Sequence, residues 1–238
     1  MRTTTQDSVA VDSNVTANAE RELGITPGHK ASSDWSAMIL HYLGLDHIGH
    51  QFGGKHSQIP FKLKEMDNVI RSVHAAVAQQ DRQRCADSNG QDCLPTLLLV
   101  CSDHGMTEDG SHGGPSDSET AATAIFISEH FSDRPPRAHH SFMLATSQRL
   151  EHRDSFRPIG AALLKSPFYA RQIDIASSLA LLLGIPIPIN NIGHLMTPLF
   201  AYHSHRDLLK CVFSLSLSLS LSLSAQVDGI LTRLYVYV

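Results

Sequence analysis

Two short segments combine aspartate and histidine at spacings that suit metal binding. In Leu45-Asp46-His47-Ile48-Gly49-His50, one helical turn separates Asp46 from His50, so both side chains can converge on one cation. The second segment, Ser102-Asp103-His104-Gly105-Met106, is followed by His112, which lies next to glycines that allow close approach of the backbone. We therefore predict a metal site whose ligands are Asp46, His50, Asp103, His104 and His112.

The donor types of this predicted site indicate zinc or manganese. Mixed carboxylate and imidazole ligation suits these ions, and a site without thiolates does not resemble a structural zinc clip. A single aspartate after a strand is usually a turn former and a single histidine an ordinary surface or core residue, so the prediction depends on the joint pattern. His47 need not point at the site, and turn or capping roles are the simpler interpretation of Thr107 and Ser111.

Apolar strands and amphipathic helices must position these ligands. The aspartate-histidine pairs each follow an apolar run, and parallel strands gather their ligands at the carboxyl edge of an α/β sheet. The run at 96–101 is apolar on both alternations, which is typical of a central parallel strand. The expected elements are strands at 37–43, 96–101 and 123–128, a helix over about 60–84, and a helix N-capped by Asp174 that ends at Gly184.

The rest of the chain divides around this predicted domain at 35–200. Residues 1–34 form a polar, weakly patterned N-terminal segment, and residues 201–238 form a tail. Residues 132–168 form a long connection without a clear period, which predicts an insertion. The tail contains a strict Ser-Leu alternation at 214–224, which indicates low complexity.

The composition excludes several classes of protein. With 238 residues, 42% of them apolar and 18% charged, the chain fits one globular domain rather than a disordered or collagen-like chain. A net charge of -4 does not indicate the positively charged surface that binds nucleic acid. The 15 histidines favour a metal site. The sequence contains neither an apolar stretch long enough for a transmembrane helix nor the apolar centre of a signal peptide.

The four cysteines and one sequon bear on the compartment without deciding it. Cys85 and Cys93 flank a polar loop and could pair in an oxidising compartment, whereas Cys101 is expected to be a buried free thiol. Asn14-Val15-Thr16 is a glycosylation sequon, a triplet that is common by chance.

The metal segments, with Gly110-Ser111-His112-Gly113, resemble the metal motifs of the alkaline phosphatase superfamily. More narrowly, the chain resembles the ethanolamine phosphate transferases of glycosylphosphatidylinositol (GPI) anchor biosynthesis, and within them the second subtype. The segments that carry this resemblance are His41-Tyr42-Leu43-Gly44-Leu45-Asp46-His47-Ile48-Gly49-His50, Lys64-Glu65-Met66-Asp67 and Leu183-Gly184-Ile185-Pro186-Ile187-Pro188. The resemblance covers about residues 8–131 and 171–200.

This resemblance implies a fold and a metal arrangement. The fold would be an alkaline-phosphatase-like three-layer α/β/α sandwich with a mostly parallel sheet. Two divalent ions, zinc or alternatively manganese, would bind there, with Asp46, His50 and His112 at one ion and Asp103 and His104 at the other.

The resemblance also implies an activity, partners and a location. The family transfers phosphoethanolamine from phosphatidylethanolamine to a mannose of the GPI glycan, for this subtype the second mannose. A covalent phosphoenzyme on threonine or serine would split the transfer into two displacements. The catalytic domain would be the lumenal, glycosylated part of a membrane protein of the endoplasmic reticulum, with a small membrane-protein subunit as a further partner.

The chain departs from the family pattern at its start. The family's catalytic domain begins with a strand that ends in a metal-binding aspartate, followed by a motif that supplies the threonine nucleophile, and residues 1–35 contain neither. We therefore expect a fragment without a catalytic nucleophile, such as an incomplete gene model, a splice product or a pseudogene, with little or no activity alone. The alternatives are a metal-dependent phosphodiesterase or phosphatase of the same superfamily, a non-catalytic metal-binding remnant, and a chain that does not fold.

Overall fold

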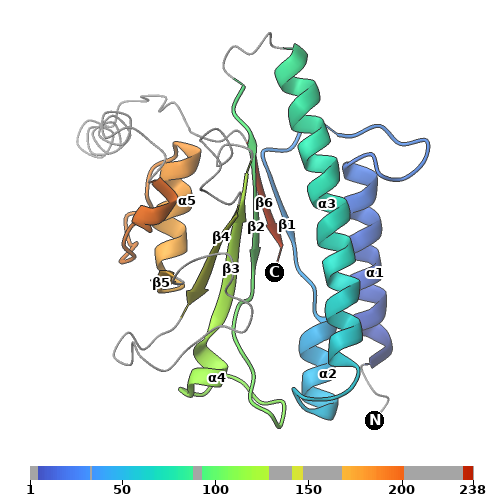
Figure 1. Ribbon diagram of the computed structural model, residues 1–238, viewed down its shortest axis with the longest axis vertical. Helices are drawn as coiled ribbons and strands as arrows, with labels where there is room; N and C mark the ends of the chain where they lie inside the picture. Colours follow the sequence, from blue (N-terminus) through green and yellow to red (C-terminus); the bar gives the residue numbers. More distant parts are fainter. Residues whose placement is uncertain are drawn as a thin grey trace.

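The computed structural model describes residues 5–32, 34–87, 93–128, 141–146, 168–200 and 233–237, which form both helices and strands (Figure 1). In chain order the elements are α1 (Thr5–Glu22), β1 (Ala37–Leu40), α2 (Gly44–Phe52), α3 (Ile59–Asp87), β2 (Thr96–Cys101), α4 (Asp117–Thr120), β3 (Ala122–Ile127), β4 (Ser141–Thr146), β5 (Phe168–Ala170), α5 (Asp174–Leu183), the 3-10 helix η2 (Thr197–Phe200) and β6 (Arg233–Tyr237).

The strands form one mixed sheet in the order β1-β6-β2-β3-β4-β5. Strand β6 pairs in parallel with β1 and with β2, and β5 pairs in parallel with β4. Strand β3 is antiparallel to both β2 and β4. The α/β class is confirmed, but the sheet is less parallel than predicted. The connection between β2 and β3 joins neighbouring strand ends at the same edge of the sheet, which makes the two strands antiparallel. A parallel pair would need a connection that crosses one face of the sheet.

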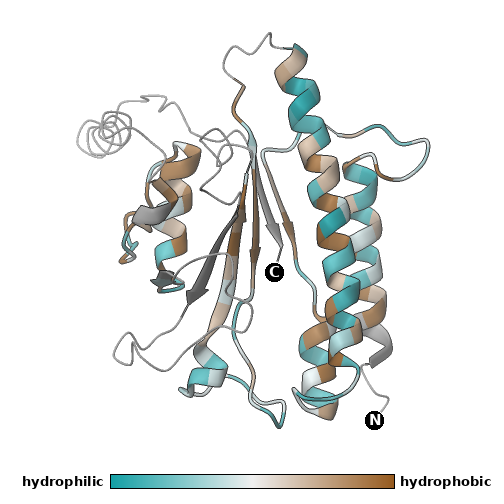
Figure 2. Ribbon diagram, viewed as in Figure 1, coloured by the Kyte–Doolittle hydropathy of each residue, from teal (hydrophilic) through white to brown (hydrophobic). Residues whose placement is uncertain are grey.

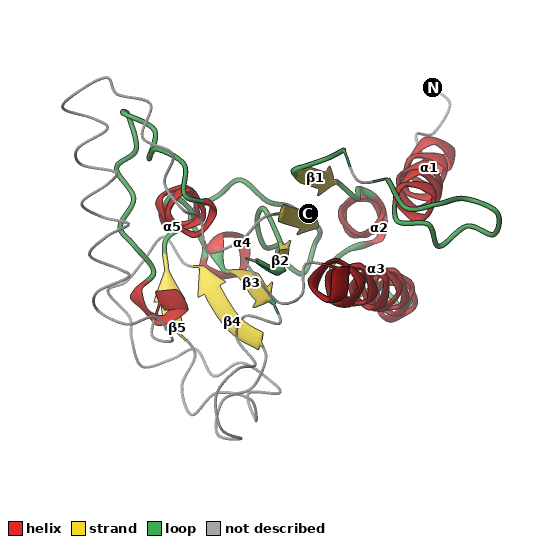
Figure 3. Ribbon diagram, turned by 90° about the horizontal axis from the view of Figure 1, so that it is seen from above, coloured by secondary structure: helices red, strands yellow, loops and turns green. Residues whose placement is uncertain are grey.

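Strand β2 lies between two hydrophobic cores, as its apolar run predicts. Leu97 and Leu99 belong to the α5-side core, which includes Phe126, Leu181 and Leu182. Leu98 belongs to the α3-side core, whose buried members also include Leu40, Met66, Val73 and Val77. Helices α1 to α3 lie on one side of the sheet and α5 on the other (Figure 3). Hydrophobic residues accordingly cover most of β2 and β3, whereas α3 alternates between hydrophobic and hydrophilic residues (Figure 2).

Helices α3 and α5 agree with their predicted positions, with one correction at the start of α5. Gly184 ends α5 in the left-handed conformation, with φ of 65°. Ile173, not Asp174, occupies the N-cap. The Asp174 carboxylate instead accepts the backbone N–H groups of Arg171 at 2.9 Å and His194 at 2.7 Å, so it joins the turn before α5 to the loop after it.

Three segments that the sequence leaves unstructured contribute elements. Residues 1–34 contain α1, whose Ala19, together with Leu23 just after the helix, is buried in the α3-side core. The predicted insertion at 132–168 contains β4, and the predicted tail at 201–238 contains β6. The Ser-Leu alternation at 214–224 lies outside the described residues. Strands β4 and β6 could not be predicted from the sequence, because strand pairing uses backbone groups and leaves no repeating pattern of side chains.

The structure pairs Cys85 with Cys93, which the sequence left as a possibility. Cys101 is a free thiol, as expected, but it is half-buried rather than buried. Burial raises the pKa of the Cys101 thiol, and the nearby charge of Asp103 adds to this effect. Among the described helices, none combines the length and apolar character needed to cross a membrane.

Candidate metal centre

The predicted ligands meet at the carboxyl edge of the sheet. Helix α2, which follows β1, carries Asp46 and His50. Asp103 and His104 follow β2, and the connection toward β3 carries His112. Because β1 and β2 run in the same direction on either side of β6, both clusters reach the same edge.

Asp46 is the centre of this group. Its Oδ2 lies 3.4 Å from His50 Nε2, and its Oδ1 lies 3.5 Å from His112 Nε2. Asp46, His104 and His112 each offer one ligand atom, and these three atoms lie within 4.8 Å of one another. This spacing is short enough for one divalent cation to contact all three.

The two remaining predicted ligands lie beside this triad. His104 Nε2 is 3.5 Å from Asp103 Oδ2, and the His104 ring stacks on His112 with ring centroids 3.7 Å apart. The His50 ring centroid is 4.8 Å from that of His112. The structure therefore brings all five residues together, and it groups His104 with Asp46 and His112, although the family resemblance assigns it to another ion.

The chemistry of Asp46 and His104 fits cation binding. Asp46 Oδ1 is buried and has no hydrogen-bond partner among the described residues, which is costly for a carboxylate oxygen unless a cation satisfies it. His104 Nδ1 lies 2.9 Å from the carbonyl oxygen of Gly105. Because a carbonyl only accepts, Nδ1 carries a proton, and in this tautomer Nε2 is the nitrogen with a lone pair for a cation. His47 is not part of the cluster.

Two glycines allow the loop that carries His112 to approach α2. A Cβ added to Gly110 would lie 2.0 Å from the carbonyl oxygen of Gly49, and one added to Gly49 would lie 2.1 Å from Met106 Sδ. Gly110 also has φ of 88°, where glycine is strongly favoured. The close backbone approach expected from the glycines near His112 is therefore present, and it brings His112 to Asp46.

Replacing Gly110 with alanine should push this loop away from α2 and weaken metal binding about tenfold, because His112 would move relative to Asp46. Gly113→Ala is the matched control. Gly113 has a similar φ of 95°, but its added Cβ would have nothing within 4 Å. Competition titration with Zn²⁺ would measure both variants. Equal affinities for the two variants would show that the contact with Gly49 is unimportant.

A buried carboxylate outside the predicted site holds the start of α2. Asp12 of α1 accepts hydrogen bonds from the backbone N–H groups of Leu43 at 2.9 Å and Gly44 at 3.1 Å. Lys62 of α3 lies 2.8 Å from the same carboxylate, and both side chains are buried. Burial opposes the charge of Lys62, but hydrogen bonds to Asp12 and Glu65 outweigh it and raise the pKa of the lysine. The polar sequence of α1 carries no signal that this one aspartate is buried.

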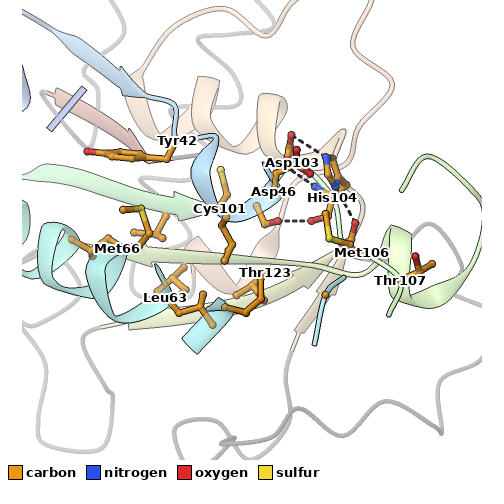
Figure 4. A pocket seen from close by; sticks show the side chains of 18 of the residues that line it. Tyr42, Asp46, Leu63, Met66, Cys101, Asp103, His104, Met106, Thr107 and Thr123 are labelled. Atoms are coloured by element: carbon orange, nitrogen blue, oxygen red, sulfur yellow. Dashed lines mark hydrogen bonds and ion pairs between the residues drawn. The ribbon is translucent and has the colours of Figure 1, made fainter. Parts of the chain in front are cut away.

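A cavity of about 600 Å³ adjoins the metal cluster (Figure 4). Asp46, Asp103 and His104 lie at one end of it, and Leu63 and Met66 of α3 line the rest together with Cys101 of β2. A few polar groups beside a mostly apolar wall are typical of small-molecule sites.

Thr107, which also lines this cavity, has the turn role expected from sequence. Its hydroxyl donates to the carboxylate of Asp109 and accepts the backbone N–H of Ser111 at 2.9 Å. These local hydrogen bonds shape the loop before His112. They give no reason to assign Thr107 as a nucleophile.

Comparison with known proteins identifies related sequences. Residues 3–113 match the family described as type I phosphodiesterase / nucleotide pyrophosphatase. The Homo sapiens protein named GPI ethanolamine phosphate transferase 2, catalytic subunit, is 34% identical over 204 residues, which are 86% of this chain and 17% of the human protein. GPI ethanolamine phosphate transferase 2 of Aspergillus oryzae is 37% identical over 199 residues, 84% of this chain and 20% of that protein. GPI ethanolamine phosphate transferase 2 of Saccharomyces cerevisiae is 36% identical over 191 residues, which are 79% of this chain and 20% of that protein.

The chain thus spans about a fifth of the length of these curated relatives. No solved structure matches it significantly.

Proposed function

We propose that this chain, which is 34 to 37% identical to GPI ethanolamine phosphate transferase 2 of three organisms, forms the metal-binding part of an enzyme that moves phosphoethanolamine from phosphatidylethanolamine to the GPI glycan. The acceptor in this proposal is the second mannose of that glycan. The convergence of Asp46, His104 and His112 at one sheet edge carries the proposal. Three ligand atoms within 4.8 Å of one another could hold one divalent ion of the kind that assists phosphoryl transfer.

The ligand set supports two divalent ions, zinc or manganese. By the family resemblance, Asp46, His50 and His112 would hold one ion, and Asp103 and His104 would contribute to the other, although His104 also lies within reach of an ion bound by Asp46 and His112. Ions bound there would polarise the phosphoryl oxygen and stabilise the leaving group. The residues of this chain hold and orient the ligands. Asp12 supports the start of α2, and the glycine contact between Gly49 and Gly110 keeps His112 beside Asp46.

The wider proposal concerns fold and location. The two cores on opposite sides of β2 support an alkaline-phosphatase-like three-layer sandwich. A GPI biosynthetic enzyme would present this part in the lumen of the endoplasmic reticulum as a glycosylated domain of a membrane protein. A small membrane-protein subunit would be a further partner.

Exchange of segments between relatives tests the proposal. In S. cerevisiae, the segment of the native transferase that aligns with this chain is replaced by the aligned residues of this chain. The strain contains no other copy of the enzyme. Mass spectrometry of GPI intermediates should detect phosphoethanolamine on the second mannose. The same chimera with His112→Ala should lose this product by about two orders of magnitude or more, because a metal ligand is missing.

An Asp117→Ala chimera is the control, because Asp117 is an exposed carboxylate of α4 outside the metal cluster. Equal product from the wild-type and His112→Ala chimeras would contradict the proposal. The match to a phosphodiesterase family favours hydrolysis as the second candidate function. Metal-dependent cleavage of a soluble nitrophenyl phosphodiester by the purified chain, without any transfer by the chimera, would support hydrolysis instead.

A further inference from the structure

A third segment reaches the sheet edge that carries the metal cluster. Strand β5 is parallel to β4, and two antiparallel pairings relate β4 to β2, so β5 and β2 run in the same direction. The turn after β5 therefore lies at the same edge as Asp103. The side-chain amide of Gln172, in this turn, donates a hydrogen bond of 2.8 Å to the carbonyl oxygen of Asp103.

We propose that Gln172 is a positioning residue that holds the Asp103–His104 turn in place for cation binding. The inference rests on the metal site of the proposed function, since Asp103 and His104 are two of its five ligands. The hydrogen bond of Gln172 goes to a backbone carbonyl and not to a ligand side chain. It acts on the backbone from which both ligand side chains project.

The turn is otherwise held by hydrogen bonds to α4 and to β3. Ser102 N–H donates to Thr123 O at 2.9 Å, and Gly105 N–H donates to Glu119 O at 2.8 Å. These bonds fix the two ends of the turn to the segment around β3. The Asp103 carbonyl at its middle accepts a hydrogen bond from Gln172, which belongs to the turn after β5. The turn is thus fixed at three points that come from two separate parts of the chain.

Gln172 is itself held in place. Asp174 N–H donates to Arg171 O, and Arg171 N–H donates to the Asp174 carboxylate, each at 2.9 Å, so the turn around Gln172 is closed twice. The backbone N–H of His194 donates to the same carboxylate at 2.7 Å.

The Asp174 carboxylate, which accepts these hydrogen bonds, is ionised at neutral pH. Burial opposes ionisation of Asp174, but the hydrogen bonds from His194 and Arg171 outweigh it and lower the pKa of the carboxyl group. Asp174 therefore stays charged, and the bonded amide groups keep their acceptor.

Small displacements of the Asp103 backbone would be transmitted to the ligands. His104 Nε2 is 3.5 Å from Asp103 Oδ2, and the His104 ring stacks on His112. Loss of the Gln172 hydrogen bond would let Asp103 and His104 move relative to the other ligands. Outer contacts that orient metal ligands typically change metal affinity 10- to 100-fold.

The test compares Gln172→Met with Gln80→Met in the full chain. Methionine keeps the length of glutamine without its amide donor. Gln80 makes the same type of bond, 3.0 Å from Nε2 to the carbonyl oxygen of Leu23, in the contact between α3 and the end of α1. Gln172→Met should weaken Co²⁺ binding about tenfold and alter the visible spectrum of the bound Co²⁺. Gln80→Met should leave both unchanged.

A second measurement does not depend on metal. Hydrogen exchange of the Ser102 and Gly105 amides in the metal-free chain should be about threefold faster in Gln172→Met and unchanged in Gln80→Met. Wild-type affinity and exchange in Gln172→Met, or equal changes in both variants, would overturn the inference. A wild-type chain that binds no Co²⁺ would contradict the metal site of the proposed function, and the exchange rates would then decide the role of Gln172.

Discussion

Replacing Asp46 with alanine should weaken Zn²⁺ or Co²⁺ binding by about 100-fold or more. Asp46 is the carboxylate of the triad, and its two oxygens face His50 and His112 at 3.4 and 3.5 Å. Without Asp46, only the imidazoles of His104 and His112 remain in the triad, and neither carries a negative charge that would attract the cation. Competition with a chromophoric chelator would measure the affinity.

The same substitution should leave the stability of the metal-free chain unchanged or slightly raise it. Asp46 Oδ1 is buried without a hydrogen-bond partner among the described residues, so its removal relieves a desolvation cost. A residue that contributes to binding and not to stability is typical of a functional site. Asp117→Ala, outside the cluster, should keep wild-type affinity. Tight binding by Asp46→Ala would contradict the metal centre.

Replacing Asp12 with alanine should lower the free energy of unfolding by about 3–5 kcal/mol. The substitution leaves the Lys62 ammonium, whose side chain is 8% exposed, without its buried partner. It also removes the acceptor for two N–H groups at the start of α2. Glu65, 2.7 Å from Lys62, remains as a partner and compensates for a part of the lost interaction. Urea unfolding followed by circular dichroism would measure the change.

Asp67→Ala is the matched control for this stability effect. Asp67 pairs with Arg71 on the exposed surface of α3, at 2.7 Å. Loss of such a surface pair should cost about 0.5 kcal/mol or less. If Asp12→Ala cost no more than Asp67→Ala, the buried pair would not stabilise the start of α2. The double substitution Asp12→Leu with Lys62→Met should recover a part of the loss, because no buried charge remains unpaired.

The sequence by itself determined the elements whose residues repeat with a local period. Met66, Val73 and Val77 mark the buried face of α3, and the continuous apolar run of β2 indicates burial on both faces. The residues of the predicted metal site were also readable, because Asp46 and His50 are one helical turn apart and Asp103-His104 directly follows a strand. Such signals are local, and they survive without knowledge of the fold.

The tertiary structure alone decided how these pieces meet. It made β3 antiparallel, inserted β6 between β1 and β2, and grouped His104 with Asp46 and His112. It also determined which polar residues make the decisive contacts, Asp12 with the start of α2 and Gln172 with Asp103. Strand pairing uses backbone groups that nearly every residue carries, and a single buried polar contact has no period. Both depend on which distant segments pack together, so neither can be determined from local sequence.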